Sequence, residues 1–236
     1  MPTIVENVKA VQASLKEKLA QIGREADEVL VVAVTKTHPV EMIESALRAG
    51  IKHFGENKVQ EARRKLPFIS EPYEGFHYIG RLQTNKINAL LELEPVLIHS
   101  IDSMDLAWNL NKRCEARGRV QDILVQVNTT DEQSKSGCEP EETIELVQQI
   151  SILPNLRVKG LMTIGLMSDT TEGMRPSFRL LKELFDELKA REDAGYEMRW
   201  LSMGMSGDYL TAIEEGANIV RLGSVLFGER DYGGMK

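Results

Sequence analysis

A lysine follows one of the most apolar stretches of the sequence. The segment "VVAVTKTHPV" spans residues 31–40 and places Lys36 directly after a run with the pattern of a buried strand. Burial lowers the pKa of a lysine and exposes the neutral, nucleophilic amine. A lysine that reaches solvent or pairs with a loop carboxylate explains the same position equally well, because most lysines do so. The position of Lys36 alone leaves both interpretations open.

Two motifs near the carboxyl end combine glycine and serine. "GMSGD" places Ser206 between glycines before an expected helix, and "RLGSVLFG" places Gly223 and Ser224 at the start of a turn or short helix. Glycine lets the backbone approach a ligand closely, and free N–H groups at a helix start attract an anion. Capping serines and ordinary turn glycines would explain either motif alone. Because both motifs follow adjacent predicted strands, together they favour a phosphate site.

The elements that must position these residues alternate between apolar runs and amphipathic helical patterns. Strands that are apolar on both faces and separated by helices indicate a parallel sheet covered by helices. Such runs are expected at residues 29–35, 52–55, 76–80, 96–102, 122–128, 158–164, 199–204 and 218–223. These units predict one α/β domain over residues 1–236, a (β/α)8 TIM barrel with an extra N-terminal helix. A doubly wound open sheet is the alternative, although no GxGxxG motif supports dinucleotide binding.

Closure of the barrel gives the candidate residues a geometry. Strand 8 of a closed barrel lies between strands 7 and 1, and the loops after the strands build the site. The phosphate site, Arg221 and Lys36 would therefore form an arc on one side of the mouth. An anion site, a cation and an amine in this order fit pyridoxal 5'-phosphate (PLP), with Lys36 forming an imine with the aldehyde and Arg221 facing the pyridine nitrogen.

The chain also resembles a known family. It is similar to the pyridoxal phosphate homeostasis proteins, whose fold is like the N-terminal barrel of alanine racemase, from roughly the first strand to the carboxyl end. The motifs that carry the resemblance are "AVTKTHP", "FGENKVQE", "HYIGRLQTNK", "VNTTDEQSKSG", "GLMTIG", "LSMGMSGDY" and "VRLGSVLFGERDY".

The resemblance implies roles for individual residues. It implies Lys36 as the Schiff-base residue, Arg221 as the partner of the pyridine nitrogen and Asn57 as a polar contact on the cofactor side. Ser206, Gly223 and Ser224 match the phosphate-binding positions of the family. It also implies a protein that holds, buffers or delivers PLP in vitamin B6 and amino-acid homeostasis, with no established turnover. We assign no role to the loop at residues 165–178.

Two features bear on whether the chain is an enzyme. An arginine has no proton to spare, so Arg221 would leave the pyridine nitrogen unprotonated and restrain carbanion chemistry. Racemisation needs a second proton-transfer group, and the two candidates, Tyr209 and Tyr232, have the patterns of a helix surface and a tail. A PLP carrier is therefore the preferred hypothesis. A PLP-dependent racemase or lyase and a lysine-imine aldolase are the alternatives.

Bulk properties narrow the possible partners. The 236 residues carry a formal charge of -7 and only two cysteines, without CxxC spacing. An acidic chain is a poor general binder of nucleic acid or anionic membranes, and unpaired cysteines are typical of a reducing compartment. No segment has the length of a membrane span. We expect a cytoplasmic monomer that binds PLP and has apo forms of PLP enzymes as candidate partners.

Four histidines fall at or near the early predicted strands: His38, His53, His77 and His99. They show no i,i+4 pairing and accompany no cysteine pair, so their spacing does not favour a metal site. We interpret them as scattered structural histidines.

Overall fold

A computed structural model of the chain describes residues 2–130, 136–166, 170–191 and 195–228. Eight parallel strands form a closed barrel in sequence order, with β8 pairing back onto β1. The predicted (β/α)8 barrel with an additional N-terminal helix is confirmed. The strands are β1 (Leu30–Val34), β2 (His53–Glu56), β3 (Gly75–Tyr78), β4 (Leu97–Ile101), β5 (Gln121–Gln126), β6 (Leu156–Met162), β7 (Tyr196–Ser202) and β8 (Ile219–Leu222).

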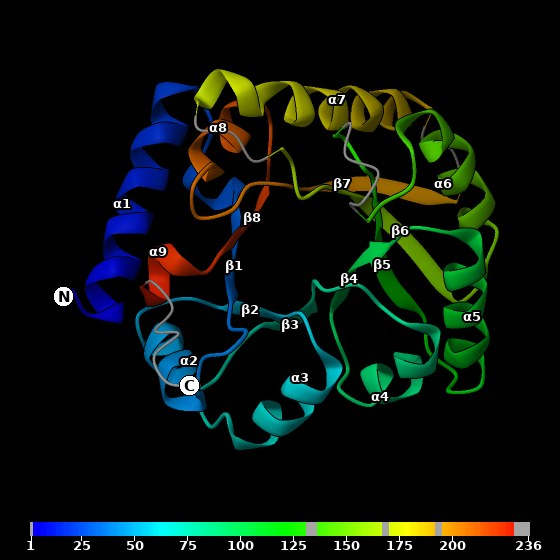
Figure 1. Cartoon of the computed structure of the whole chain (residues 1–236), viewed down its shortest axis with the longest axis horizontal. Coiled ribbons are helices and arrows are strands. Elements are labelled where there is room, and N and C mark those ends of the chain that lie inside the picture. The colour runs from blue at the N-terminus through cyan, green and yellow to red at the C-terminus, as the bar shows by residue number, and fades with distance from the viewer. Residues whose placement is uncertain (1, 131–135, 167–169, 192–194, 229–236) are drawn as a thin grey trace, which may run out of the picture.

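Helices surround the barrel, as Figure 1 shows. They are α1 (Ile4–Gln21), α2 (Val40–Arg48), α3 (Val59–Lys65), α4 (Ile87–Leu91), α5 (Met104–Glu115), α6 (Thr143–Ser151), α7 (Thr171–Ala190), α8 (Tyr209–Glu214) and α9 (Ser224–Phe227). Short 3₁₀ turns, among them η1 (Ala26–Glu28), connect some of these elements. Among the helices of the described residues, none is long and apolar enough to cross a membrane.

The extra helix α1 covers the outside of the barrel near the closing strand pair. The helix after β8, α9, has only four residues, and α1 packs against α9, α8 and α2 (Figure 1). Thr3 and Glu6 form a capping box at its start, and Val8, Val11 and Leu15 are buried along one face. The predicted N-terminal helix is therefore amphipathic. Helix α1 covers the part of the barrel surface that a longer helix after β8 would cover.

The barrel interior contains an apolar layer that is separate from the main core. Val32, Leu97, Leu124, Met162 and Ile219 form this layer. Side chains alternate along a strand, so the residues two positions further on also face the interior. In β4 and β8 these residues are His99 and Arg221, and both are buried. Polar groups therefore lie next to the apolar layer, on the side of the strand carboxyl ends.

A glycine allows β6 and β7 to approach where their register shifts. Gly160 has a φ of +144°, and a Cβ at this position would lie 1.9 Å from the carbonyl oxygen of Trp200. Two residues further along β7 is Ser202, whose carbonyl accepts a hydrogen bond from the backbone N–H of Thr163. The absence of a side chain at Gly160 thus sets the spacing of strands that reach the mouth.

We expect Gly160→Ala to lower the free energy of unfolding by about 3 kcal/mol or more, because it adds a steric overlap to an unfavourable φ. Gly118→Ala is the matched control, since Gly118 has a φ of +60° but no heavy atom within 4 Å of its added Cβ. The control should cost about 1–2 kcal/mol. Urea unfolding of both variants measures the difference, and equal losses would contradict the close approach.

Candidate functional site

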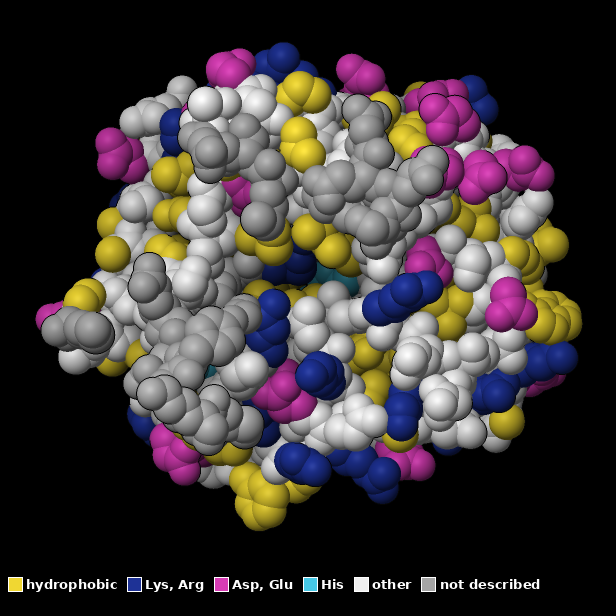
Figure 2. All heavy atoms as spheres, viewed as in Figure 1, with side chains coloured by type: hydrophobic (Ala, Val, Ile, Leu, Met, Phe, Trp, Pro, Cys, Tyr) yellow, Lys and Arg dark blue, Asp and Glu magenta, His cyan; other side chains and the backbone are white. Residues whose placement is uncertain are grey.

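The candidate residues lie at the carboxyl ends of their strands. Lys36 follows β1, Asn57 follows β2, Arg221 lies within β8, and Gly223 and Ser224 follow β8. Ser206 lies between β7 and α8. The face viewed in Figure 1 is hollowed at its centre, and Lys or Arg and His side chains lie at the bottom of the hollow (Figure 2).

The backbone on both sides of Lys36 is held by polar side chains, which are buried on the Thr35 side and partly exposed on the Thr37 side. The hydroxyl of Thr35 donates to Glu56 Oε1 at 2.7 Å, and the Thr35 carbonyl accepts from Lys65 Nζ at 2.8 Å. On the other side, Thr37 adopts a φ of 68° and donates its N–H to Glu61. A non-glycine residue in this conformation is strained and needs such support. Lys36, which is half-buried, therefore lies on a fixed turn.

A buried ion pair supplies this support. Glu56 is fully buried, and its Oε1 accepts from Lys65 Nζ at 2.8 Å, while Lys65 also contacts Glu61 Oε1 at 2.6 Å. Burial raises the pKa of Glu56, and the hydrogen bonds from Lys65 and Thr35 oppose this shift. The geometry therefore makes Glu56 and Lys65 a structural pair beneath the Lys36 turn.

The side chain of Asn57 presents a buried oxygen. Its Oδ1 has no hydrogen-bond partner among the described residues. Gly80, in the loop after β3, allows the Asn57 backbone to pack closely, because a Cβ there would lie 2.0 Å from the Asn57 carbonyl oxygen. An unpaired buried acceptor is costly, so its presence is consistent with a ligand contact. The importance of Gly80 was not apparent from the sequence.

The two glycine–serine motifs are joined in space. Ser206 Oγ accepts hydrogen bonds from the backbone N–H groups of Gly223 at 3.0 Å and Val225 at 3.3 Å. One hydroxyl thus links the loop after β7 to the start of α9. The hydroxyls of Ser206 and Ser224 and the N–H of Ser224 are the kinds of donor that bind a phosphate, while the N–H of Gly223 already donates to Ser206.

Pairing of β1 with β8 brings the contact between Ser206 and Gly223 near Lys36. Val32 aligns with Arg221 and Ala33 with Leu222, and a Cβ at Gly223 would lie 3.6 Å from Val34 Cβ. Lys36 follows Val34 by two residues, a step of about 7 Å in extended chain. Lys36 and the Ser206–Gly223 contact therefore occupy neighbouring positions at the barrel seam.

Arg221 is a buried cation held by neutral groups. One guanidinium nitrogen donates to Ser202 Oγ at 2.8 Å and the other to the Thr163 carbonyl at 2.8 Å. None of the ion pairs between described residues includes it. Burial lowers the pKa of Arg221 to about 10, partly offset by Asp208, so it stays charged at neutral pH. Toward the described residues these two bonds use two of its five N–H groups, which leaves three for other contacts.

Three of the four histidines are linked, so the interpretation of scattered histidines is wrong for them. His53 Nδ1 lies 3.0 Å from His77 Nε2, and His77 Nδ1 lies 2.9 Å from His99 Nε2. His99 Nδ1 lies 3.0 Å from Ser202 Oγ, which also binds Arg221. These contacts form a hydrogen-bonded series, the histidine chain, which consists of His53, His77, His99 and Ser202. It crosses the barrel interior from β2, β3 and β4 to β7.

Tyr209 differs from its predicted position. Its side chain is 9% exposed and packs in the core, because α8 turns that face toward the barrel. The interpretation of Tyr209 as helix surface was wrong. Tyr232 lies outside the described residues.

Comparison with known proteins places the chain in a well-populated family. The family model "Alanine racemase, N-terminal domain" matches residues 11–231. The chain is 42% identical over 227 residues to the pyridoxal phosphate homeostasis protein of Aquifex aeolicus, a match that covers 96% of this chain and 98% of that protein.

Solved structures agree with this relationship. A crystal structure of an unknown protein from Bifidobacterium adolescentis has a TM-score of 0.90 at 36% identity and covers 95% of this chain and 94% of that one. PipY of Synechococcus elongatus, solved with PLP bound, has a TM-score of 0.79 at 33% identity and covers 91% of this chain and 100% of that chain. Alanine racemase of Clostridium difficile, at 14% identity and a TM-score of 0.73, shares the fold; this chain covers 57% of it.

We expect Lys65→Met to lower the free energy of unfolding by about 3–5 kcal/mol at pH 8, because Glu56 would stay buried without its counter-charge. The loss should shrink near pH 5. The folded-state pKa of Glu56 is raised above 4.5, so the folded protein takes up a proton as the pH falls, and stability decreases as the pH rises through that window.

Arg63→Met is the control for this substitution. Arg63 lies on the same helix and pairs with Glu92 at 3.7 Å on the surface, where both side chains are more than half exposed. Its loss should cost less than about 1 kcal/mol. Urea unfolding at both pH values measures the effect. An equal cost for the two variants would refute the structural role of the Glu56–Lys65 pair.

Proposed function

The chain belongs to the family of the pyridoxal phosphate homeostasis proteins, and we propose on this premise that it binds PLP and holds, buffers or delivers it. The observation that carries the proposal is the seam between β1 and β8, where Lys36, Arg221 and the Ser206–Gly223 contact lie together. We propose that residues 1–236 form one PLP-binding domain. The PLP-bound structure of PipY, which is 33% identical to this chain, supports PLP as the ligand.

The polar groups at the seam fit the parts of PLP. The N–H group of Ser224 and the two serine hydroxyls suit the phosphate, while the Gly223 N–H holds Ser206 in place. Asn57 Oδ1, which has no partner among the described residues, offers an acceptor after β2, the strand that pairs with β1. PLP itself supplies an aldehyde and a conjugated ring that withdraws electrons. Lys36 would bond its nitrogen to the aldehyde carbon as a Schiff base, with the aldehyde oxygen leaving as water.

Arg221 limits the site to restrained carbanion chemistry, such as racemisation, or to no chemistry. Its guanidinium can donate to the pyridine nitrogen but keeps its own proton, so the ring stays a weak electron sink. A carboxylate at this position would hold a proton on the ring and strengthen carbanion chemistry. The site thus binds the ring while limiting its reactivity.

A PLP-dependent racemase or lyase of narrow activity is the second candidate. It needs a proton-transfer group opposite Lys36, and the burial of Tyr209 in the core removes one of the two tyrosines considered for that task. A lysine-imine aldolase, the third candidate, would bind a phosphorylated sugar and no coenzyme.

We also propose a cytoplasmic monomer that passes PLP to apo forms of PLP enzymes. Cys114 and Cys138 are buried and free, which suits a reducing compartment. The match to the Aquifex aeolicus relative covers 98% of that protein, whereas the match to the racemase covers 57%. The Aquifex aeolicus relative is therefore about as long as this chain.

Transfer of bound PLP to an apo-enzyme, compared with its release into buffer, separates these functions. A carrier should deliver PLP to the apo-enzyme faster than it releases PLP into buffer, and should exchange no α-deuterium from a panel of amino acids. Deuterium loss with wild-type protein but not with Lys36→Ala would instead establish a PLP enzyme.

Lys36→Ala should abolish the imine absorbance while phosphate-anchored PLP binding remains, because Ser206, Gly223 and Ser224 are unchanged. Borohydride reduction followed by peptide mapping should find the coenzyme on Lys36 in the wild type and on no lysine in the variant. Lys58→Ala, which removes an exposed lysine next to Asn57, is the control and should keep the wild-type spectrum. An unchanged spectrum in Lys36→Ala would refute the assignment.

Ser206→Ala should weaken PLP retention about tenfold or more, since it removes a hydroxyl that contacts a charged group and also orders the N–H groups of Gly223 and Val225. Equilibrium dialysis measures the dissociation constant. Ser45→Ala, on the exposed side of α2, should leave it unchanged. Equal affinities for wild type and Ser206→Ala would place the phosphate elsewhere.

A further inference from the structure

The histidine chain has two ends of opposite charge. At one end, the Arg221 guanidinium donates to Ser202 Oγ. At the other end, His53 Nε2 lies 3.5 Å from Glu74 Oε2. Between them, His77 and His99 are 2% and 0% exposed, so water does not compete for their nitrogens.

The arginine end determines the direction of the first hydrogen bonds. A guanidinium only donates, so Ser202 Oγ must accept from Arg221. Among the described residues, the remaining neighbour of this buried hydroxyl is His99 Nδ1. The Ser202 hydroxyl therefore donates its proton to His99 Nδ1, because any other arrangement leaves a buried O–H unsatisfied.

The direction then propagates through neutral rings. Burial lowers the pKa of His77 to about 3 and the pKa of His99 well below its usual value, so each carries one ring proton at neutral pH. With Nδ1 accepting, His99 has its proton on Nε2 and donates to His77 Nδ1. By the same logic, His77 donates from Nε2 to His53 Nδ1.

The carboxylate end imposes the same direction. With Nδ1 accepting, His53 carries its proton on Nε2, which faces a carboxylate that only accepts. Burial lowers the pKa of His53, and Glu74 opposes this shift. The two ends therefore agree, and the chain has one consistent set of tautomers from Arg221 to Glu74.

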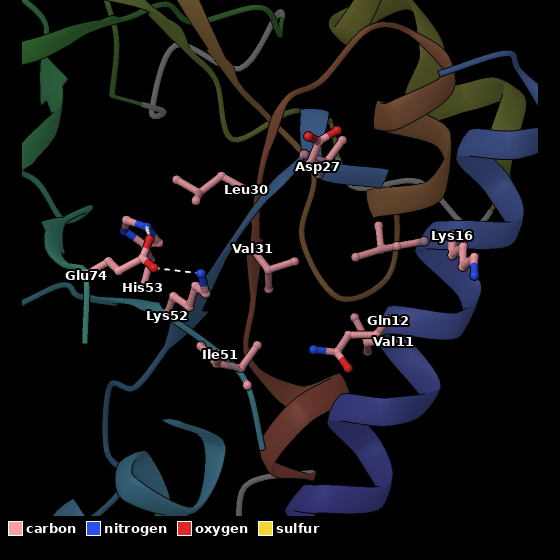
Figure 3. Close-up of a pocket in the computed structure, with 13 residues that line it drawn as sticks. Val11, Gln12, Lys16, Asp27, Leu30, Val31, Ile51, Lys52, His53 and Glu74 are labelled. Atoms are coloured by element: carbon pink, nitrogen blue, oxygen red, sulfur yellow. Dashed lines mark ion pairs between the residues drawn. The ribbon is translucent and has the colours of Figure 1, made fainter. Parts of the chain in front are cut away.

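The His53 end of the histidine chain lines a cavity away from the mouth of the barrel. A cavity of about 450 Å³ lies between α1, η1 and the starts of β1 and β2. His53, Lys52 and Glu74 line it, with Lys52 paired to Glu74 at 2.7 Å (Figure 3). Lys16 from α1 and Asp27 from η1 are the other charged groups that line the cavity.

We infer that Ser202, His99, His77 and His53 are positioning residues that hold the Arg221 guanidinium in one orientation through a chain of fixed tautomers anchored at Glu74. The inference rests on the proposed function, because the orientation matters for the contact between Arg221 and the pyridine ring. Ser202 fixes one guanidinium nitrogen and the Thr163 carbonyl fixes the other. The plane of the guanidinium is thereby set before any ligand enters, which lowers the entropic cost of binding.

The tautomers can be measured without any ligand. The sequence has four histidines, so the imidazole nitrogens of protein labelled with ¹⁵N-histidine give a simple long-range ¹H–¹⁵N spectrum. His77 and His99, assigned with His77→Gln and His99→Gln, should each appear as a single neutral tautomer with the proton on Nε2, from about pH 8 to about pH 5. A proton on Nδ1 of either ring, or a mixture of tautomers, would overturn the inference.

Ser202→Ala tests the connection to Arg221. In this variant the Glu74 end should still hold the His99 proton on Nε2, but the absorption maximum of bound PLP should shift and the dissociation constant for PLP should rise about tenfold. Ser100→Ala is the matched control, because Ser100 is equally buried on β4 but donates to the Gly80 carbonyl. It should leave tautomers, absorption and affinity unchanged.

The outcomes separate the inference from the function. Wild-type affinity and absorption in Ser202→Ala would overturn the positioning role even if the tautomers are as expected. Failure of the wild-type protein to bind PLP would refute the proposed function and, with it, the positioning role of the histidine chain. The ¹H–¹⁵N spectrum of the free protein would still determine the histidine tautomers.

Discussion

The pairing of β8 with β1 is the constraint on which the site depends. This pairing closes the barrel and aligns Arg221 with Val32 and the turn at Gly223 with Val34. Without closure, residues separated by most of the chain would lie at opposite edges of an open sheet. The short α9 and the packing of α1 against it protect the outside of this seam. Fold and site are therefore stabilised by the same contact.

The second requirement is that charged groups remain buried without losing their partners. Glu56 is held by Lys65 and Thr35, and Arg221 is held by Ser202 and Thr163. Burying either charge without these hydrogen bonds would cost several kcal/mol. One arrangement fixes the turn that carries the lysine, and the other fixes the cation at the barrel centre. Rigid polar groups of this kind suit a protein that binds a charged coenzyme.

Much of the fold was predictable from the sequence, and the site only in part. Apolar runs separated by helical patterns located all eight strands to within about three residues, because a parallel sheet buried on both faces leaves a strong signal. Strand order then indicated that Lys36, Arg221 and the glycine–serine motifs share one face. The contact of Ser206 with Gly223 was not predictable, since it depends on loop conformation.

The histidine chain shows why the remainder was missed. Its members are 24 and 22 residues apart in sequence, so each lies on a successive strand, and their contact depends on register and barrel tilt. The signal was available as one histidine per strand–helix unit from β2 to β4, followed by a serine at the end of β7. Spacing rules for helical metal sites do not detect such a pattern.

A crystal structure of the protein with PLP tests the central claim most directly. The account predicts continuous density from Lys36 Nζ to the coenzyme, with the phosphate bound by Ser206 and the start of α9 and with Arg221 facing the pyridine ring. Coenzyme attached to a different lysine, or a phosphate bound away from the β1–β8 seam, would contradict it.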